Sequence, residues 1–373
     1  MDADGHEGTA TARRPEGADG DADAVPSRGA GRGVGIATLD DLREHLQWAI
    51  ELEHATIPSY LCALYSLDAT RNLDAVEIVQ SIFLEEMLHL ALVANVLNAV
   101  GGRPELDSPR LMPGGLRTLP HRDPPLPLSL LPFGPEALEL FLQIEQPGAP
   151  DAPPQADSYT TIGQFYEAIR GGLLALVEEH GPAHVFSGDP QRQIADDEFK
   201  AGPGRIFEVT GVETAIEAID LIVHQGEGTG HVDVWDGDHD MFHPERRAVG
   251  HYYRLLQLTL GRRFRPGDTP ASGPSGDAIT IDWTAVSPMR RDPRTADFPD
   301  GPVRAAMDLF NATYGTVLHR LEQAFDGRRE VFSSAVSAMF HLRTSAVTLM
   351  SMPIDGSDET AGPSFEYVPP ERR

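Results

Sequence analysis

Apolar side chains recur every three or four residues in two long stretches in the first third of the sequence. The first stretch, 42–67, carries a stripe of Leu46, Ile50, Ile57, Leu61 and Leu64. The second, 73–100, carries Val79, Ile82, Val93, Leu97 and Val100 and ends at two glycines. This spacing places side chains on one face of a helix. Two long helices are therefore predicted, and the second has so few polar flanks that it should be buried on most sides.

Shorter helical patterns follow, and loops rich in proline separate them. They cover 161–179, 212–225, 244–260, 303–325 and 329–351, and a short apolar segment at 137–145 precedes them. The longest connections, 103–135 and 265–302, contain Pro and Gly clusters that interrupt regular structure. Strand signals are few. The sequence thus predicts an all-α fold, a four-helix bundle with long Pro-rich loops and additional C-terminal helices.

The first 36 residues differ from the rest in composition. They are rich in Gly, Ala and Asp and nearly lack large apolar side chains. Such a segment buries too little apolar surface to offset the entropy of ordering it. We therefore expect residues 1–36 to form a disordered tail and residues 38–368 to form the folded domain.

Candidate chemistry lies where the two long stripes are interrupted. Glu53 occupies a core-facing gap in the first stripe, and Glu86 and His89 occupy gaps in the second. Residues three apart project from one helix face, and an unpaired buried carboxylate costs several kcal/mol. A Glu on one helix and Glu-x-x-His on the next form half of the ligand set of di-iron carboxylate bundles. Glu85 is an alternative to Glu86, although the three-residue spacing favours Glu86.

The other half of such a set should come from two further helices. Glu167 is the candidate for the lone glutamate, and Glu227 with His251 is the candidate for the second Glu/His pair. His251 lies on an apolar stripe and so should face inward. Glu227 and His251 are 24 residues apart rather than three, so the helix must break near Gly226 and Gly228 and re-enter. His231 is the alternative partner of Glu227.

Charge and composition narrow the function. The 373 residues include 57 Asp and Glu against 30 Lys and Arg, a formal net charge of -27, which argues against nucleic acid and anionic membranes as partners. One cysteine, Cys62, excludes an internal disulfide and a Cys-rich metal site. No apolar run is long enough to span a membrane, and no secretory signal is visible. A cytoplasmic protein is expected, and its oligomeric state stays open, homo-oligomers included.

Four carboxylates would balance two divalent cations, and two imidazoles suit iron better than magnesium or calcium. We therefore expect two iron ions per chain, with manganese as the alternative metal. Six protein ligands leave coordination positions open for O2 and substrate.

Several segments resemble one known family. Glu51-Leu-Glu-His-Ala-Thr-Ile-Pro and Glu85-Glu-Met-Leu-His-Leu-Ala are similar to the ferritin-like domain of the iminophenylpyruvate dimer synthase group, associated with violacein-type bisindole biosynthesis. Further matches are 162–169, 225–228, 251–254 and 362–367. The resemblance implies a ferritin-like fold and a dinuclear non-haem site with Glu53, Glu86, His89, Glu167, Glu227 and His251 as ligands.

Three classes of function remain. The first is a di-iron oxidase or oxygenase that acts on a small organic, amino-acid-derived substrate in secondary metabolism. The second is a ferritin-like iron-binding protein or ferroxidase without an organic substrate, and the third is a bundle without metal. Long Pro-rich loops fit a lid over a substrate pocket better than a tiled storage shell. The Glu-x-x-His motif argues against the third class, so the enzyme is the leading hypothesis.

Overall fold

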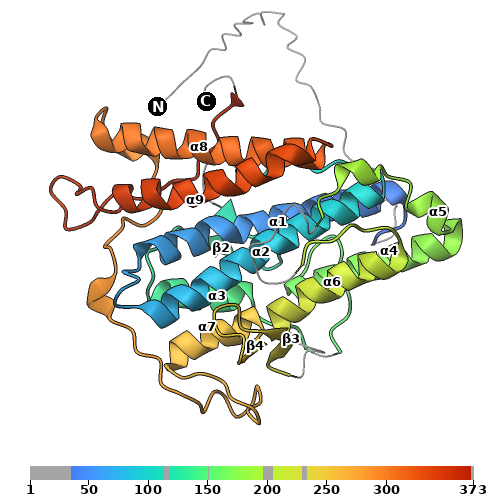
Figure 1. The fold of residues 1–373 in the computed structure, drawn as a ribbon, viewed down its shortest axis with the longest axis horizontal. Helices are drawn as coiled ribbons and strands as arrows, with labels where there is room; N and C mark the ends of the chain where they lie inside the picture. The colour runs from blue at the N-terminus through green and yellow to red at the C-terminus, as the bar shows by residue number, and fades with distance from the viewer. Residues whose placement is uncertain (1–34, 113–116, 150, 196–204, 229–232, 371–373) are drawn as a thin grey trace, which may run out of the picture. The chain divides into compact units, whose positions relative to one another are not determined.

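The computed structural model describes residues 35–112, 117–149, 151–195, 205–228 and 233–370. The expected tail lies almost wholly outside these residues. Two long helices, α1 (Leu39–Ser66) and α2 (Leu73–Ala99), form the centre of the fold and pack against each other over most of their length (Figure 1). Thr38 begins α1 with a reciprocal cap, since its hydroxyl accepts the Asp41 N–H and the Asp41 carboxylate accepts the Thr38 N–H. Both helices bury most of their residues, as predicted for α2, whereas for α1 the sequence predicted one apolar face.

Four further helices cover one side of this central pair. Both α3 (Pro135–Ile144) and α4 (Ile162–His180) contact α1, whereas α6 (Val212–Glu227) and α7 (His251–Leu260) contact α2. Contacts of α3 with α7 and of α4 with α6 close the arrangement. It is a four-helix bundle in which the third and fourth positions are each filled by two shorter helices.

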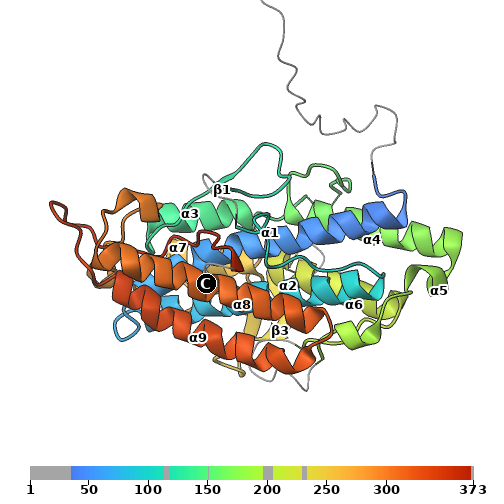
Figure 2. The same ribbon diagram turned by 90° about the horizontal axis from the view of Figure 1, so that it is seen from above.

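The C-terminal helices α8 (Pro302–Phe325) and α9 (Phe332–Leu349) pack on the other side of α1 and α2, as the two views together show (Figures 1 and 2). His54 of α1 faces this layer, and its Nε2 lies 2.8 Å from the Tyr314 hydroxyl of α8. Burial lowers the pKa of His54 to about 3, so its ring is neutral. His54 therefore belongs to the contact with α8 and not to the Glu53 side of α1.

The remaining elements are short. They are α5 (Pro182–Val185), the strand pair β1 (Arg117–Thr118) and β2 (Pro127–Leu128), the strand pair β3 (Trp235–His239) and β4 (Arg247–Val249), and the 3-10 turns η1 (Pro190–Arg192), η3 (Trp283–Ala285), η4 (Thr295–Asp297) and η5 (Arg329–Val331). Both strand pairs are antiparallel, and Arg117 lies opposite Leu128 in the first.

The all-α prediction is confirmed, with one difference. The helix expected over 244–260 begins only at His251, because the antiparallel hairpin β3–β4 occupies 235–249. No helix among the described residues combines the length and the apolar character needed to cross a membrane.

Candidate metal centre

The central pair of helices supplies the first half of a buried polar cluster. Glu53 of α1 and Glu86 and His89 of α2 are each 2–3 % exposed. His89 Nδ1 lies 3.4 Å from Glu53 Oε2 and 3.8 Å from Glu86 Oε1. One ligand-type atom from each residue falls within 4.8 Å of the other two. The sequence placed these three side chains correctly, because two long uninterrupted helices fix which positions face inward.

The second half consists of Glu86 again, Glu145 and His251. His251 Nδ1 lies 3.0 Å from Glu86 Oε1 and 3.5 Å from Glu145 Oε2, and the three residues satisfy the same 4.8 Å limit. Glu86 Oε1 is therefore within 4 Å of both histidine Nδ1 atoms. The rings of His89 and His251 are nearly parallel, with centroids 5.5 Å apart. The geometry is that of two adjacent donor sets that share one carboxylate.

Each carboxylate is oriented by a hydroxyl group. Tyr166 of α4 donates to Glu53 Oε1, and Tyr60 of α1 donates to Glu145 Oε1. Thr56 donates to Glu86 Oε2 at 2.6 Å. Burial and the adjacent carboxylates raise the pKa of both tyrosines well above its ordinary value, so the phenols keep their protons and act as donors. In each of the three carboxylates, the oxygen that accepts no hydroxyl hydrogen bond is the one that lies near a histidine Nδ1.

Each imidazole is also held from its far side. His89 Nε2 lies 2.9 Å from Gln225 Oε1, and His251 Nε2 lies 2.8 Å from Glu85 Oε2. Glu85 in turn pairs with Arg254, at 2.9 Å. A proton on each Nε2 satisfies these acceptors and leaves the Nδ1 lone pair directed into the cluster, the arrangement typical of metal-binding histidines.

The electrostatics show that the cluster needs positive charge. Burial and the carboxylates of Glu145 and Glu53 raise the pKa of Glu86 to about 7. Burial disfavours the charged form of His251, yet Glu145, Glu85 and Glu86 raise its pKa well above the ordinary value. Carboxylates crowded in a low-dielectric interior thus retain protons unless a cation replaces them.

The donor set fits a pair of metal ions. His251 Nδ1 is completely buried and makes no hydrogen bond to any described residue, despite its nearness to two carboxylates. A buried polar atom without a partner costs free energy, and a cation between Nδ1 and the carboxylate oxygens would satisfy it. Three carboxylates with two imidazoles are ligands that iron and related transition metals accept.

Two of the expected ligands lie elsewhere. Glu167 is in neither donor set, because its side chain is 41 % exposed and its carboxylate is 4.0 Å from Arg170. Glu227 is buried, but its Oε1 accepts the Gly163 N–H at 2.9 Å and its Oε2 accepts the Gly148 N–H at 3.2 Å. A side chain at Gly163 would place Cβ 2.5 Å from Glu227 Oε1, so only glycine permits this close approach. His231 lies outside the described residues.

Sequence reasoning missed Glu145 and did not identify the role of Glu85, which it weighed only as an alternative to Glu86. Glu145 is the residue that follows α3, two residues before Pro147, in a stretch read as a short apolar segment between Pro-rich loops. The signal was present, since Ala137, Phe141 and Glu145 are four residues apart and share one helix face. Glu85 is not an alternative to Glu86 but the acceptor that orients His251.

The fold and the cluster define a class, helical bundles whose interior carries carboxylate and imidazole groups at ligand spacing. A family model described as ferritin-like matches residues 46–260, and the chain belongs to the ferritin-like family. The resemblance seen in the sequence is thereby confirmed.

Two comparisons extend this assignment. The chain is 28 % identical over 320 residues to the dichlorochromopyrrolate synthase of Lentzea aerocolonigenes. That alignment covers 76 % of this chain but only 29 % of the relative, so the chain spans less than a third of that protein's length. The fold is similar to the crystal structure of a ferritin-like protein from Caulobacter vibrioides, with a TM-score of 0.58, 26 % identity, and coverage of 84 % of this chain and 96 % of that one.

Proposed function

We propose that the chain holds two metal ions between α1, α2, α3 and α7 and is a non-haem di-iron oxidase or oxygenase of secondary metabolism. The observation that carries the proposal is the pair of donor sets that share Glu86. Glu53 and His89 would hold one ion, Glu145 and His251 the other, and Glu86 would serve both. Iron is the metal proposed, and manganese is the alternative.

Bound iron would supply redox chemistry, the exchange of electrons between an organic molecule and dioxygen. The chain's own residues prepare the site for it. Tyr60, Tyr166 and Thr56 fix the carboxylates, while Gln225 and Glu85 fix the imidazoles in the tautomer that presents Nδ1. Since all five donor side chains are buried, the protein also limits the access of water to the centre.

The substrate class is inferred from the relative. Its name denotes a synthase of a chlorinated pyrrole acid, and such a product belongs to secondary metabolism. We propose a small organic, amino-acid-derived substrate and O2 as the co-substrate of this chain. Because the chain covers only part of that relative, the same reaction is not assumed.

The first test counts metals. Metal-free protein is loaded anaerobically with Fe(II), desalted and analysed for iron per chain. Close to two ions per chain are expected, and at most one ion, with no substitute metal, would rule out the dinuclear centre.

The second test separates enzyme from iron storage. Loaded protein is exposed to O2 with and without a panel of aromatic amino acids and their 2-oxo and 2-imino acids. O2 uptake that depends on one compound, with an oxidised organic product, supports the enzyme. Continued oxidation of added Fe(II) with no response to any compound supports the ferroxidase alternative.

A further inference from the structure

The β3–β4 hairpin is connected to both histidines of the metal centre. Two chains of side-chain contacts start at the Nε2 atoms of His89 and His251, on the side of each ring away from the cluster, and both end on strand β3. The residues at their ends, Asp236 and Asp238, are two positions apart, the spacing that places side chains on one face of a strand. One short strand thus lies at the end of the contacts that hold both rings.

The first chain holds His251 through a buried ion-paired network. Glu85 Oε2 lies 2.8 Å from His251 Nε2 and 2.9 Å from Arg254 Nη1. Arg254 Nη2 bonds Asp236 Oδ2 at 2.7 Å. All four residues have exposed fractions of 5 % or less. Because one planar guanidinium bonds two carboxylates at once, it fixes the position of Glu85 relative to the strand.

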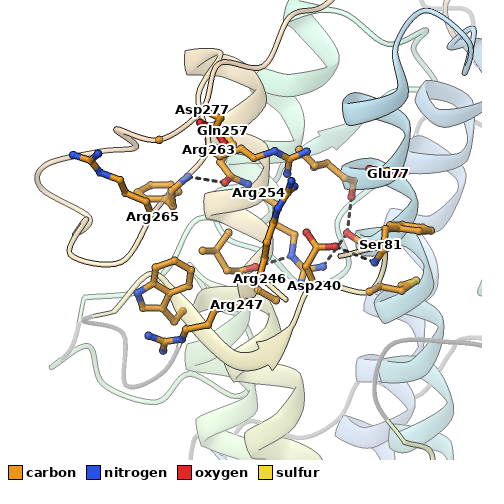
Figure 3. Close-up of a pocket in the computed structure, with 18 of the residues that line it drawn as sticks. Glu77, Ser81, Asp240, Arg246, Arg247, Arg254, Gln257, Arg263, Arg265 and Asp277 are labelled. Atoms are coloured by element: carbon orange, nitrogen blue, oxygen red, sulfur yellow. Dashed lines mark hydrogen bonds between the residues drawn. The ribbon is translucent and has the colours of Figure 1, made fainter. Parts of the chain in front are cut away.

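Arg254 is itself held by four partners. Besides the two carboxylates, its Nε donates to the Val249 carbonyl of β4 at 2.6 Å, and its Nη1 donates to the Ser81 hydroxyl of α2 at 3.0 Å. Figure 3 shows Arg254 and Ser81 at the wall of a pocket between α2, α7 and the hairpin. A buried guanidinium with four fixed partners has little freedom to move. Arg254 therefore joins both strands of the hairpin to α2, which carries Glu85.

The second chain holds His89 through a neutral amide. Gln225 Oε1 lies 2.9 Å from His89 Nε2, and Gln225 Nε2 donates to Asp238 Oδ2 at 3.0 Å. Gln225 is buried, whereas Asp238 is exposed. An ionised carboxylate only accepts hydrogen bonds, so Asp238 selects the nitrogen end of the amide. The oxygen end is then left for the His89 Nε2 proton.

We infer that the β3–β4 hairpin positions both metal-binding histidines. Asp236 acts on His251 through Arg254, and Asp238 acts on His89. All three hairpin-linked groups act through an intervening side chain, so they are positioning residues. The inference rests on the proposed metal centre. Each chain serves one ring, so damage to one chain weakens metal binding at one position only. Coupling between two sites is also reciprocal, so bound metal must stabilise the hairpin.

The first test measures metal binding at each position. Fe(II) is titrated anaerobically into the full chain by calorimetry, and anomalous scattering from crystals grown with limiting iron gives the occupancy of each position. Arg254→Lys keeps the charge but cannot bond both carboxylates at once, so affinity should fall about tenfold at the His251 position alone. Asp238→Ala should lower affinity about threefold at the His89 position alone, the effect of one ordinary hydrogen bond.

Two controls separate positioning from a general loss of structure. Arg117→Lys removes another guanidinium, one on β1 that bonds the backbone carbonyls of Ser364 and Phe365, and should leave both positions unchanged. Arg254→Lys in a Glu85→Gln background should cause no further loss, because the arginine acts through that carboxylate. Additive losses, or equal losses at both positions from either single variant, would overturn the inference.

The second test needs no variant. Hydrogen exchange is compared between metal-free protein and protein shown to hold two iron ions. Backbone amides of residues 235–249 should exchange about tenfold more slowly with metal bound, and those of the β1–β2 pair should exchange at the same rate in both forms. Unchanged exchange in the hairpin, or equal slowing in both strand pairs, would overturn the inference and leave the metal centre standing. Failure to bind iron would instead refute the proposed function, and the inference with it.

Discussion

The two halves of the metal centre share Glu86 but are built differently. Glu53, Glu86 and His89 come from the middle of two long helices that pack along each other. Glu145 and His251 come from helix boundaries, since Glu145 follows the last residue of α3 and His251 is the first of α7. Long helices fix a side chain through their periodicity, whereas helix ends depend on loops and turns. The first half can accordingly be predicted from the sequence, whereas the position of the second half depends on tertiary contacts.

The largest expected effect comes from the residue that both halves share. Glu86→Gln keeps the shape of the side chain but removes its charge and the oxygen that approaches both histidines. Affinity should fall at both positions by more than about 100-fold, beyond the 10–100-fold loss typical for partners of ligands. Elemental analysis and calorimetric titration would measure it. Retention of one tightly bound ion would show that Glu86 serves only one half.

An intermediate effect should separate Glu145 from the residue expected in its place. Glu145→Gln should leave about one metal per chain, held by Glu53, Glu86 and His89, because it disables only the second donor set. Glu167→Gln is the matched control and should retain both ions, since Glu167 faces solvent. Metal counts with anomalous diffraction at each position would decide. Loss of one ion from Glu167→Gln, with both ions retained by Glu145→Gln, would show that Glu167 is the ligand instead.

The smallest effect should come from the residue behind His89. Gln225→Leu removes the acceptor of the His89 Nε2 proton, so the ring loses its fixed tautomer, and affinity at that half should fall about tenfold. Gln193→Leu also removes a buried amide, one that bonds the Val209 backbone instead, and serves as control. Both variants should lose stability, but only Gln225→Leu should weaken metal binding. Equal metal affinities would mean that Gln225 is merely structural.

The sequence predicted the bundle and the α1–α2 half because both rest on helical periodicity. The prediction was wrong where the conformation of a loop determines the start of a helix or the partner of a side chain. The hairpin β3–β4 delays the start of α7 to His251, and periodicity does not reveal it. Glu227 is buried as expected, but the backbone N–H groups of Gly148 and Gly163, distant in sequence, donate hydrogen bonds to its carboxylate. Glu167 shares a helix with Tyr166, and a rotation of one residue places the tyrosine, not the glutamate, against Glu53.

The three hydroxyl donors also bear on metal selectivity. Tyr60, Tyr166 and Thr56 each donate to one carboxylate oxygen, so each of Glu53, Glu86 and Glu145 presents one oxygen that accepts no hydroxyl hydrogen bond, and the carboxylates are held from rotating to bind a cation through both oxygens. Calcium takes six to eight oxygen ligands and commonly binds carboxylates through both oxygens. This centre would offer calcium carboxylates held in one orientation, together with nitrogen donors that calcium does not favour. The hydroxyl groups that hold the carboxylates in place thus also make the centre a poor host for calcium.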